Sequence, residues 1–422
     1  MRYATFEVIN MFAGMRDAVA KSLQLEEPWF VESIYFDEKL AEVHIHVGIR
    51  DGARFVCPRC GSEASRDGYE PTERVWRHSD CFFYKTYVHC RRPRILCPHC
   101  GAVQINAPFE RKHSRFTFSY EGYAMLLLTD MPRSKVARAL RCDEKSVDSI
   151  LNYWIENALK EQDLKGATEL AIDETSFKRL HNYVTVIINS IKSCVIDVEN
   201  GRGKDTVTAF AQKLEEKGGN RDCVTSVTSD LSKTYVPAIA ETFPHAVNII
   251  DKFHVKKLFI DAMDSVRKAE QKVVRNKKEL FCNRHLLMIP QSRLTEEQTS
   301  KMMSISKQYP LTGRAYRIVA ALDDFYNCKT VEEAGAAFKA LYSWMRRCRL
   351  EPMKKVAETL RRHEPKILAY FVFRHTNAVC EGINSMIQAA KRKARGFHTF
   401  RGFASMIYLV AGKLELGVPD PF

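Results

Sequence analysis

The stretch ELAIDETSFKR, residues 169–179, runs from apolar residues straight into two adjacent carboxylates. The apolar residues are typical of a buried strand, and Asp173 and Glu174 follow them directly. Successive side chains of a strand point to opposite faces, so these two acids cannot serve one site equally. Asp173 is the preferred metal ligand, with a polar strand end as the alternative. Glu174 is a secondary residue beside the site.

The segments that follow alternate between strand and helix patterns. Two β-branched, apolar runs predict two more strands, and their short connection predicts an antiparallel hairpin. A helix, a strand, a second helix and a strand ending in a turn are predicted next. The seven elements occupy residues 169–177, 182–190, 193–200, 204–217, 223–230, 232–243 and 246–255. This is the order of elements in an α/β RNase H-like core.

In that topology the first and fourth strands are neighbours in the sheet. Asp230 ends the fourth strand, so Asp173 and Asp230 are expected to converge. Paired carboxylates can hold two Mg²⁺ ions about 3.5–4 Å apart, which is one way that enzymes cut phosphodiesters. An Asp before a helix is also a common N-cap, and spacing alone leaves both interpretations of Asp230 open.

A third acid is expected from a helix beside the sheet. The stretch RHTNAVCEGINSMIQAAKRKARGFHTFRGF, residues 374–403, has apolar residues at helical spacing and carries Glu381 in its first turns. Compensation of the helix dipole is the alternative role for this carboxylate. A basic run lies on and just past the helix. It predicts contacts with the phosphates of DNA, and a solvent-exposed basic face is the alternative. The run consists of Lys391, Arg392, Lys393 and Arg395.

Two Cys-x-x-Cys turns, CPRCG at 57–61 and CPHCG at 97–101, predict a metal site. Two such turns complete a tetrahedral four-cysteine zinc site, which is structural because no coordination position stays open. Unrelated thiols or a redox pair are the alternatives. The segment between the turns is expected to form a hairpin or short sheet, as in a zinc ribbon, with Cys81 and Cys90 as core residues. The predicted zinc ligands are Cys57, Cys60, Cys97 and Cys100.

Arg91 and Arg92 stand beside the second cysteine turn. They are candidate phosphate contacts, and a solvated basic face is the equal alternative.

MPRSKVARALRCDEKSVDSILNYWI, residues 131–155, fits a helix-turn-helix. Ser134 is expected to cap the first helix, and Ser146 to begin the second. Lys145 and Ser146, at the start of the second helix, are candidate DNA contacts. An ordinary helical hairpin is the alternative.

The composition bounds the class of protein. The 422 residues allow two to four domains, and a hydrophobic content of 45% can build real cores. Sixty-five Lys and Arg residues against 51 acids give a formal net charge of +14, which favours a polyanionic partner. No signal peptide or membrane span is apparent, so the 13 cysteines are expected to be reduced thiols, some of which bind metal.

The chain resembles transposases of the ISL3 family of bacterial insertion sequences over nearly its whole length. The resemblance is carried by AIDETSFKR, GRGKDTV, VTSDLSKTYVPAIAETFPHAVNIIDKFHVKKL and TNAVCEGINSMIQAAKRKARGFHTFRGF. The family often has Thr-Asn-Gly ahead of its Glu-Gly, whereas this chain has Ala378 in TNAVCEG, a departure that leaves the acid in place.

The resemblance implies a multidomain enzyme in which a zinc ribbon and a helix-turn-helix precede an RNase H-like DDE core. Carried over position by position, the catalytic triad is Asp173, Asp230 and Glu381, which would bind Mg²⁺ or Mn²⁺. Asp251 and His254 match the family pattern as residues beside the site, although a core histidine is the alternative for His254. The expected domains are an N-terminal segment at 1–50, the zinc domain at 51–112, the helix-turn-helix at 113–164 and the catalytic domain at 165–422, with a helical insertion at 256–365.

The implied function is DNA transposition. The enzyme is expected to bind the terminal inverted repeats of its element and to cleave and transfer DNA strands with divalent metal ions. Its partners would be double-stranded element ends and target DNA, without a membrane, in a homo-oligomer within the bacterial cytoplasm and nucleoid. The alternatives are a DNA-binding regulator with a degenerate core and a structure-specific RNase H-like nuclease.

Overall fold

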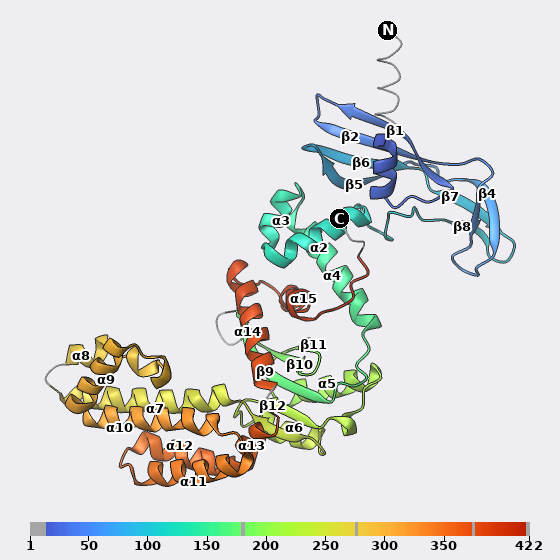
Figure 1. The fold of residues 1–422 in the computed structure, drawn as a ribbon. Coiled ribbons are helices and arrows are strands. Elements are labelled where there is room, and N and C mark those ends of the chain that lie inside the picture. Colours follow the sequence, from blue (N-terminus) through green and yellow to red (C-terminus); the bar gives the residue numbers. More distant parts are fainter. Residues whose placement is uncertain (1–13, 179–181, 275–276, 374–375, 419–422) are drawn as a thin grey trace. The chain divides into compact units, whose positions relative to one another are not determined.

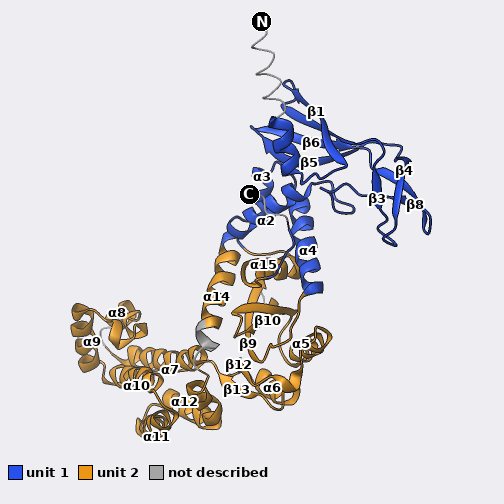
Figure 2. Ribbon diagram, turned by 45° about the vertical axis from the view of Figure 1, so that its right-hand side comes forward, with its two compact units in different colours: residues 1–161, 393–395, 414–422 blue, residues 162–392, 396–413 orange. Residues whose placement is uncertain are grey.

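The computed structural model describes residues 14–178, 182–274, 277–373 and 376–418 (Figure 1). The chain divides into two compact units (Figure 2). The first holds residues 1–161, 393–395 and 414–422, and the second holds residues 162–392 and 396–413. Among the described residues, none of the helices has the length and apolar character needed to cross a membrane.

The first unit opens with a short helix at residues 14–22 and then contains a four-stranded sheet in the order β1-β2-β6-β5 (Figure 1). Strict alternation along β2 buries Val43, Ile45 and Val47 and turns His44 and His46 to the other face. Strand β1 was missed by the sequence analysis. The strands of this sheet are β1 Trp29–Asp37, β2 Glu42–Ile49, β5 Arg74–Cys81 and β6 Tyr84–Cys90.

A second four-stranded sheet, in the order β3-β4-β7-β8, carries the cysteine turns. The hairpin expected between these turns is present as β5 and β6, but β6 pairs in parallel with β2 and not with the ribbon strands. Cys90 is buried in the core of the unit as predicted, while Cys81 is partly buried against that core. The ribbon strands are β3 Arg54–Val56, β4 Glu63–Tyr69, β7 Pro93–Cys97 and β8 Gly101–Gln104.

Three helices complete the first unit. Thr117 caps α2 by accepting a hydrogen bond from the backbone of Tyr120, and a tight turn joins α3 to α4. The buried face of α4 includes Val147, Ile150 and Leu151, which recur at helical spacing. The helices are α2 Phe118–Asp130, α3 Arg133–Ala139 and α4 Glu144–Glu161.

The second unit is built on a five-stranded sheet in the order β11-β10-β9-β12-β13. Strands β9, β10 and β11 are antiparallel neighbours, whereas β12 runs parallel to both β9 and β13. The predicted elements are all present, with shorter ends for the fourth and fifth strands. The bounds are β9 Glu169–Lys178, β10 Asn182–Asn189, β11 Cys194–Asn200, α5 Lys204–Glu216, β12 Ser226–Ser229, α6 Tyr235–Thr242 and β13 Val247–Ile250.

Helices cover both faces of this sheet (Figure 1). Leu170 and Ile172 of β9 join the core formed with α5 and α6. Alternate β9 residues face α14 Thr376–Lys393 and α15 Phe400–Ala411, where Phe177 stacks on Phe403 and Gln388 bonds to Thr175. The two acids of the opening stretch therefore lie toward different layers, as strand alternation predicted.

A long helical segment separates β13 from α14. Helices α7 and α10 pack side by side in it (Figures 1 and 2) and share one apolar core with their neighbours. Asp251 accepts a hydrogen bond from the backbone of Phe253 and caps α7, so residues 252–255 are helical where a turn was expected. The helices are α7 Lys252–Val273, α8 Lys277–Cys282, α9 Glu296–Gln308, α10 Pro310–Asn327, α11 Val331–Arg347, α12 Glu351–Arg362 and α13 Glu364–Leu368.

Candidate functional site

The register between β9 and β12 brings two of the predicted acids to one edge of the sheet. Thr228 pairs with Ala171 in parallel. Asp230 lies two residues beyond Thr228, as Asp173 lies two beyond Ala171, so the acids continue the same register. Asp230 accepts a hydrogen bond of 2.9 Å from the backbone of Ser232 and does not cap α6, whose N-cap residue is Thr234.

Asp173 is partly buried and has a defined partner. Burial raises the pKa of its carboxyl, while the side-chain amide of Asn384 on α14 donates a hydrogen bond to Oδ2. The backbone N–H of Glu174 donates to Oδ1 at 2.8 Å. Burying a carboxylate costs free energy that a nearby cation offsets, so this position suits a metal ligand.

Helix α14 lies along β9 through one row of polar side chains. Asn384 bonds to Asp173, Gln388 to the Thr175 hydroxyl at 3.0 Å, and Lys391 to the backbone carbonyl of Ser176. Residues three or four apart share one helix face. Glu381 is three residues before Asn384 and is exposed, so it continues this row past Asp173.

Glu174 faces the other layer. Its carboxylate lies 3.9 Å from the guanidinium of Arg202, and burial together with the charge of Asp230 raises its pKa. Tyr235 of α6 also contacts it and lowers the pKa. These contacts give Glu174 local partners away from Asn384.

Asp251 and His254 bring a fourth acid and a histidine to the same edge. The backbone N–H of Asp251 bonds to the carbonyl of Ser229 at 2.9 Å, and its carboxylate lies 3.3 Å from Nδ1 of His254. Burial lowers the pKa of His254, but the hydrogen bond to Asp251 and the charges of Asp173 and Asp230 outweigh it and raise the pKa. With its side chain 29% exposed, His254 is no core histidine.

Asp173, Asp230 and Asp251 bring carboxylate oxygens to one edge of the sheet. Carboxylate oxygens are the ligands that Mg²⁺ and Mn²⁺ prefer. Asn384 was missed by the sequence analysis. Its position one helical turn after Glu381 was the available signal, but only the docking of α14 on β9 reveals its partner.

The four cysteines of the two turns converge in the ribbon. Their sulfur atoms all lie within 4.8 Å of one another, and Cys60 Sγ is 3.4 Å from Cys97 Sγ. Hydrogen bonds from the backbone and hydroxyl of Ser62 lower the pKa of Cys60 to about 6, which favours the thiolate that binds zinc. Gly61 and Gly101 close the turns with φ of +76° and +71°, a backbone region that favours glycine. This arrangement fits a structural Zn²⁺.

Arg92 has structural partners that compete with phosphate. Its side chain is 12% exposed and pairs with Glu70 at 3.0 Å and with Glu110 at 3.3 Å. The prediction of Arg92 as a phosphate contact therefore needs correction, because two carboxylates already neutralise its charge. Arg91 is exposed and donates hydrogen bonds to the carbonyls of Glu70 and Pro71.

Helices α3 and α4 form the predicted helix-turn-helix with different caps. Ser134 lies inside α3, whose N-cap is Pro132, so the prediction that Ser134 caps it is wrong. Asp143 precedes α4 and accepts hydrogen bonds of 2.8 Å from both the backbone and the hydroxyl of Ser146. Ser146 is 6% exposed and is thus corrected from a DNA contact to part of the cap, whereas Lys145 is exposed.

A hollow beside the start of α4 has a basic lining that the sequence analysis missed. Arg115 and His113 line it together with Lys145, and the backbone N–H groups of a helix start add positive potential. The preceding loop gave no periodic pattern by which these two residues could be found.

The helix-turn-helix is stabilised by a buried carboxylate. Glu121 is fully buried, and its oxygens accept hydrogen bonds of 2.8 Å from Arg111 and Trp154. Glu121→Ala leaves Arg111 buried without a counter-charge. We therefore expect the free energy of unfolding to fall by about 3–5 kcal/mol. Urea unfolding measures this, with exposed Glu161→Ala as the matched control. A loss equal to that of the control would contradict the expectation.

The basic run after Glu381 is largely exposed. Lys391 is half-buried against β9, while Arg392, Lys393 and Arg395 are exposed. Lys393 lies 3.5 Å from Asp130, a weak surface pair that leaves its charge accessible.

Comparison with known families shows which family this chain belongs to. The family model for the ISL3 transposase domain, described as "Transposase", matches residues 170–407. The chain belongs to the ISL3 family of transposases. Residues 106–155 match the helix-turn-helix domain of transposase family ISL3, and residues 53–100 match the zinc-finger of transposase IS204/IS1001/IS1096/IS1165. The predicted resemblance is thus confirmed, and this DNA transposase is an enzyme of the DDE type.

Two curated relatives agree with this assignment. The transposase is 25% identical over 418 residues to the transposase for insertion sequence element IS1557 of Mycobacterium tuberculosis, covering 92% of this chain and 93% of the relative. It is 24% identical over 348 residues to the transposase for insertion sequence element IS1001 of Bordetella parapertussis, covering 81% and 85%. These matches do not favour the two alternatives, a DNA-binding regulator with a degenerate core and a structure-specific RNase H-like nuclease.

Proposed function

We propose that this transposase cleaves and transfers DNA strands at an RNase H-like core whose triad is Asp173, Asp230 and Glu381. The strand order β11-β10-β9-β12-β13 supports such a core, with α7 to α13 as a helical insertion. The continued register of Asp173 and Asp230, with the Glu381 helix docked on β9 through Asn384, is the observation that carries the proposal.

The triad is proposed to hold Mg²⁺ or Mn²⁺. Divalent cations bound there would activate an attacking water or 3′-hydroxyl and stabilise the leaving oxygen of the phosphodiester. Asn384 orients the Asp173 carboxylate, and His254 with Asp251 sets the charge at the edge of the site. Glu174, held by contacts on the opposite face of β9, is proposed as a supporting residue.

DNA recognition is proposed for the first unit. The four cysteines would bind a structural Zn²⁺ that fixes the ribbon, and α4 would present Lys145 to the terminal inverted repeats. Arg91, Arg392, Lys393 and Arg395 are exposed cations that suit phosphate contacts. Because transposition joins two element ends, we also propose a homo-oligomer on double-stranded DNA.

A repeat-scrambling experiment tests end recognition. We expect purified protein with Mn²⁺ to cut duplexes that carry the element's own terminal repeat, and to leave duplexes with a scrambled repeat of equal composition largely uncut. Specific sites are typically bound about 10³-fold or more tightly than non-specific DNA, so the difference should be large. Cleavage of both duplexes at equal rates would favour the structure-specific nuclease instead.

A further inference from the structure

In the first unit, the sheet formed by β1, β2, β6 and β5 carries a cluster of histidines on the face opposite its core. Strand alternation along β2 directs His44 and His46 outward, and the parallel register places His46 directly beside His89 of β6. The rings of His46 and His89 stack with centroids 4.6 Å apart. Neither the four-cysteine site nor the catalytic edge uses these residues.

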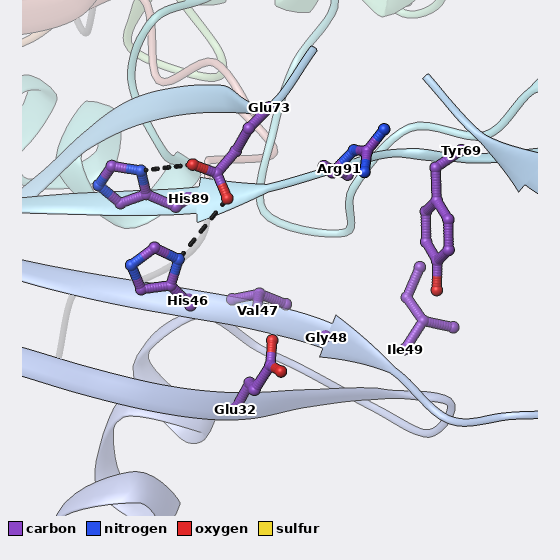
Figure 3. A pocket seen from close by; sticks show the side chains of 9 residues that line it. All are labelled: Glu32, His46, Val47, Gly48, Ile49, Tyr69, Glu73, His89 and Arg91. Carbon is purple, nitrogen blue, oxygen red and sulfur yellow. Dashed lines mark hydrogen bonds and ion pairs between the residues drawn. The ribbon is translucent and has the colours of Figure 1, made fainter. Parts of the chain in front are cut away.

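One carboxylate joins the two rings (Figure 3). Glu73 precedes β5, and its oxygens lie 3.1 Å from Nδ1 of His89 and 3.6 Å from Nδ1 of His46. One ligand atom from each of the three residues lies within 4.8 Å of the others. A tetrahedral ion with bonds of about 2.0–2.1 Å holds its ligand atoms about 3.3 Å apart, so small side-chain shifts would suffice.

A second set of contacts orients the His89 ring. Its Nε2 lies 2.9 Å from Nδ1 of His44, and Nε2 of His44 lies 3.5 Å from the carboxylate of Glu42. Metal-binding histidines usually donate their other ring N–H to a carboxylate, carbonyl or water, which fixes the ring and raises its basicity. Here the acceptor would be the His44 ring, with Glu42 behind it. His44 therefore has the position of an outer partner, and His89 that of the inner ligand.

The cluster is accessible to an ion from solvent. The side chains of His46 and Glu73 are 37% and 44% exposed, whereas that of His89 is 14% exposed. Glu32 and Arg91 line the same pocket (Figure 3). Solvent entering this pocket would supply the fourth ligand.

We propose that His46, Glu73 and His89 form a second metal site, distinct from the four-cysteine site, that binds a borderline divalent cation such as Zn²⁺, Co²⁺ or Ni²⁺. Two imidazoles and one carboxylate suit these ions better than Mg²⁺ or Ca²⁺, which prefer oxygen ligands. The ion would tie β2 and β6 to the turn before β5. Protonated imidazoles could instead hydrogen-bond to Glu73 without any metal. Counting the metal ions bound per chain distinguishes a metal site from such a hydrogen-bonded cluster.

The test is the zinc content of the full chain after dialysis against buffered free Zn²⁺. We expect His46→Ala and His89→Ala each to hold one zinc fewer per chain than the native protein. Glu73→Gln should lower the affinity for that zinc at least about 10-fold, since loss of even an outer partner of a metal ligand lowers metal affinity about 10–100-fold. His245→Ala, with its side chain 68% exposed in the second unit, is the matched control and should keep the native count.

A measurement on the native chain tests the proposal even if the variants fail to fold. We expect Zn²⁺ to protect His46 and His89 from modification by diethyl pyrocarbonate, measured on the peptide that carries each histidine, while His245 stays reactive. Equal zinc counts in folded His46→Ala, His89→Ala and native protein would overturn the proposal. Unchanged reactivity of His46 and His89 under Zn²⁺ would overturn it as well, leaving a hydrogen-bonded cluster only.

Discussion

Replacing Asp173 by Asn is expected to abolish strand cleavage and strand transfer while leaving the binding of element ends intact. Asn keeps the shape of the side chain and can still contact Asn384, but it removes the negative charge that a divalent cation needs. Metal ions in such sites stabilise the transition state by several kcal/mol, so we expect a loss on the order of 10³-fold or more. Cleavage of a labelled end duplex measures the loss, and gel shift measures binding.

The other triad members should behave in the same way. Asp230→Asn and Glu381→Gln are expected to lose cleavage to a similar extent, because the proposed mechanism has all three carboxylates hold the same divalent cations. Asp222→Asn is the matched control, since this side chain is 63% exposed and lies outside the acidic cluster. Strand transfer at the native rate in any of the three triad variants would refute that residue's assignment.

Cys57→Ser is expected to remove one zinc per chain and to disorder the ribbon that contains β3, β4, β7 and β8. This sheet is small, and bound zinc in comparable domains contributes an apparent 10–16 kcal/mol, which a ribbon of this size cannot replace by packing. End-specific binding should fall with it, because the ribbon would no longer present a fixed surface. Zinc analysis and limited proteolysis of the full chain measure the two effects.

A matched thiol separates zinc loss from general damage. Cys223 is exposed and lies in the second unit, so Cys223→Ser should retain native zinc and native DNA binding. The effect of Cys57→Ser on zinc is additive to any loss through His46, because the two clusters share no ligand. Native zinc content in Cys57→Ser would show that the four cysteines do not form the site.

Local pattern predicted the elements of the second unit well, and tertiary context decided their ends. The run at 223–230 is a strand only over Ser226–Ser229, because the chain enters it from a short 3-10 turn. The helix expected from Ser232 begins at Tyr235, since Asp230 and Ser232 form a turn first. Strand β1 was missed because charged and polar residues interrupt its alternation, and a bulge shifts its register.

The pairing of distant segments could not be read from the sequence. The region between the cysteine turns has strand character, but its parallel pairing with β2 depends on a partner about forty residues away. The ion pairs of Arg92 and the burial of Ser146 likewise follow from packing, and both removed a predicted DNA contact. Surface charge in a sequence does not reveal which cations already have partners.

The sequence by itself determined the kinds of elements, the four-cysteine motif and the acids that resemble the triad, because periodicity and short spacings are local properties of the chain. Only the tertiary structure decided that Asp230 continues the register of Asp173, that α14 docks through Asn384, and that His46, Glu73 and His89 meet around one point. Strand register and helix docking are set by burial of side chains far apart in sequence, and that information is absent from any single segment.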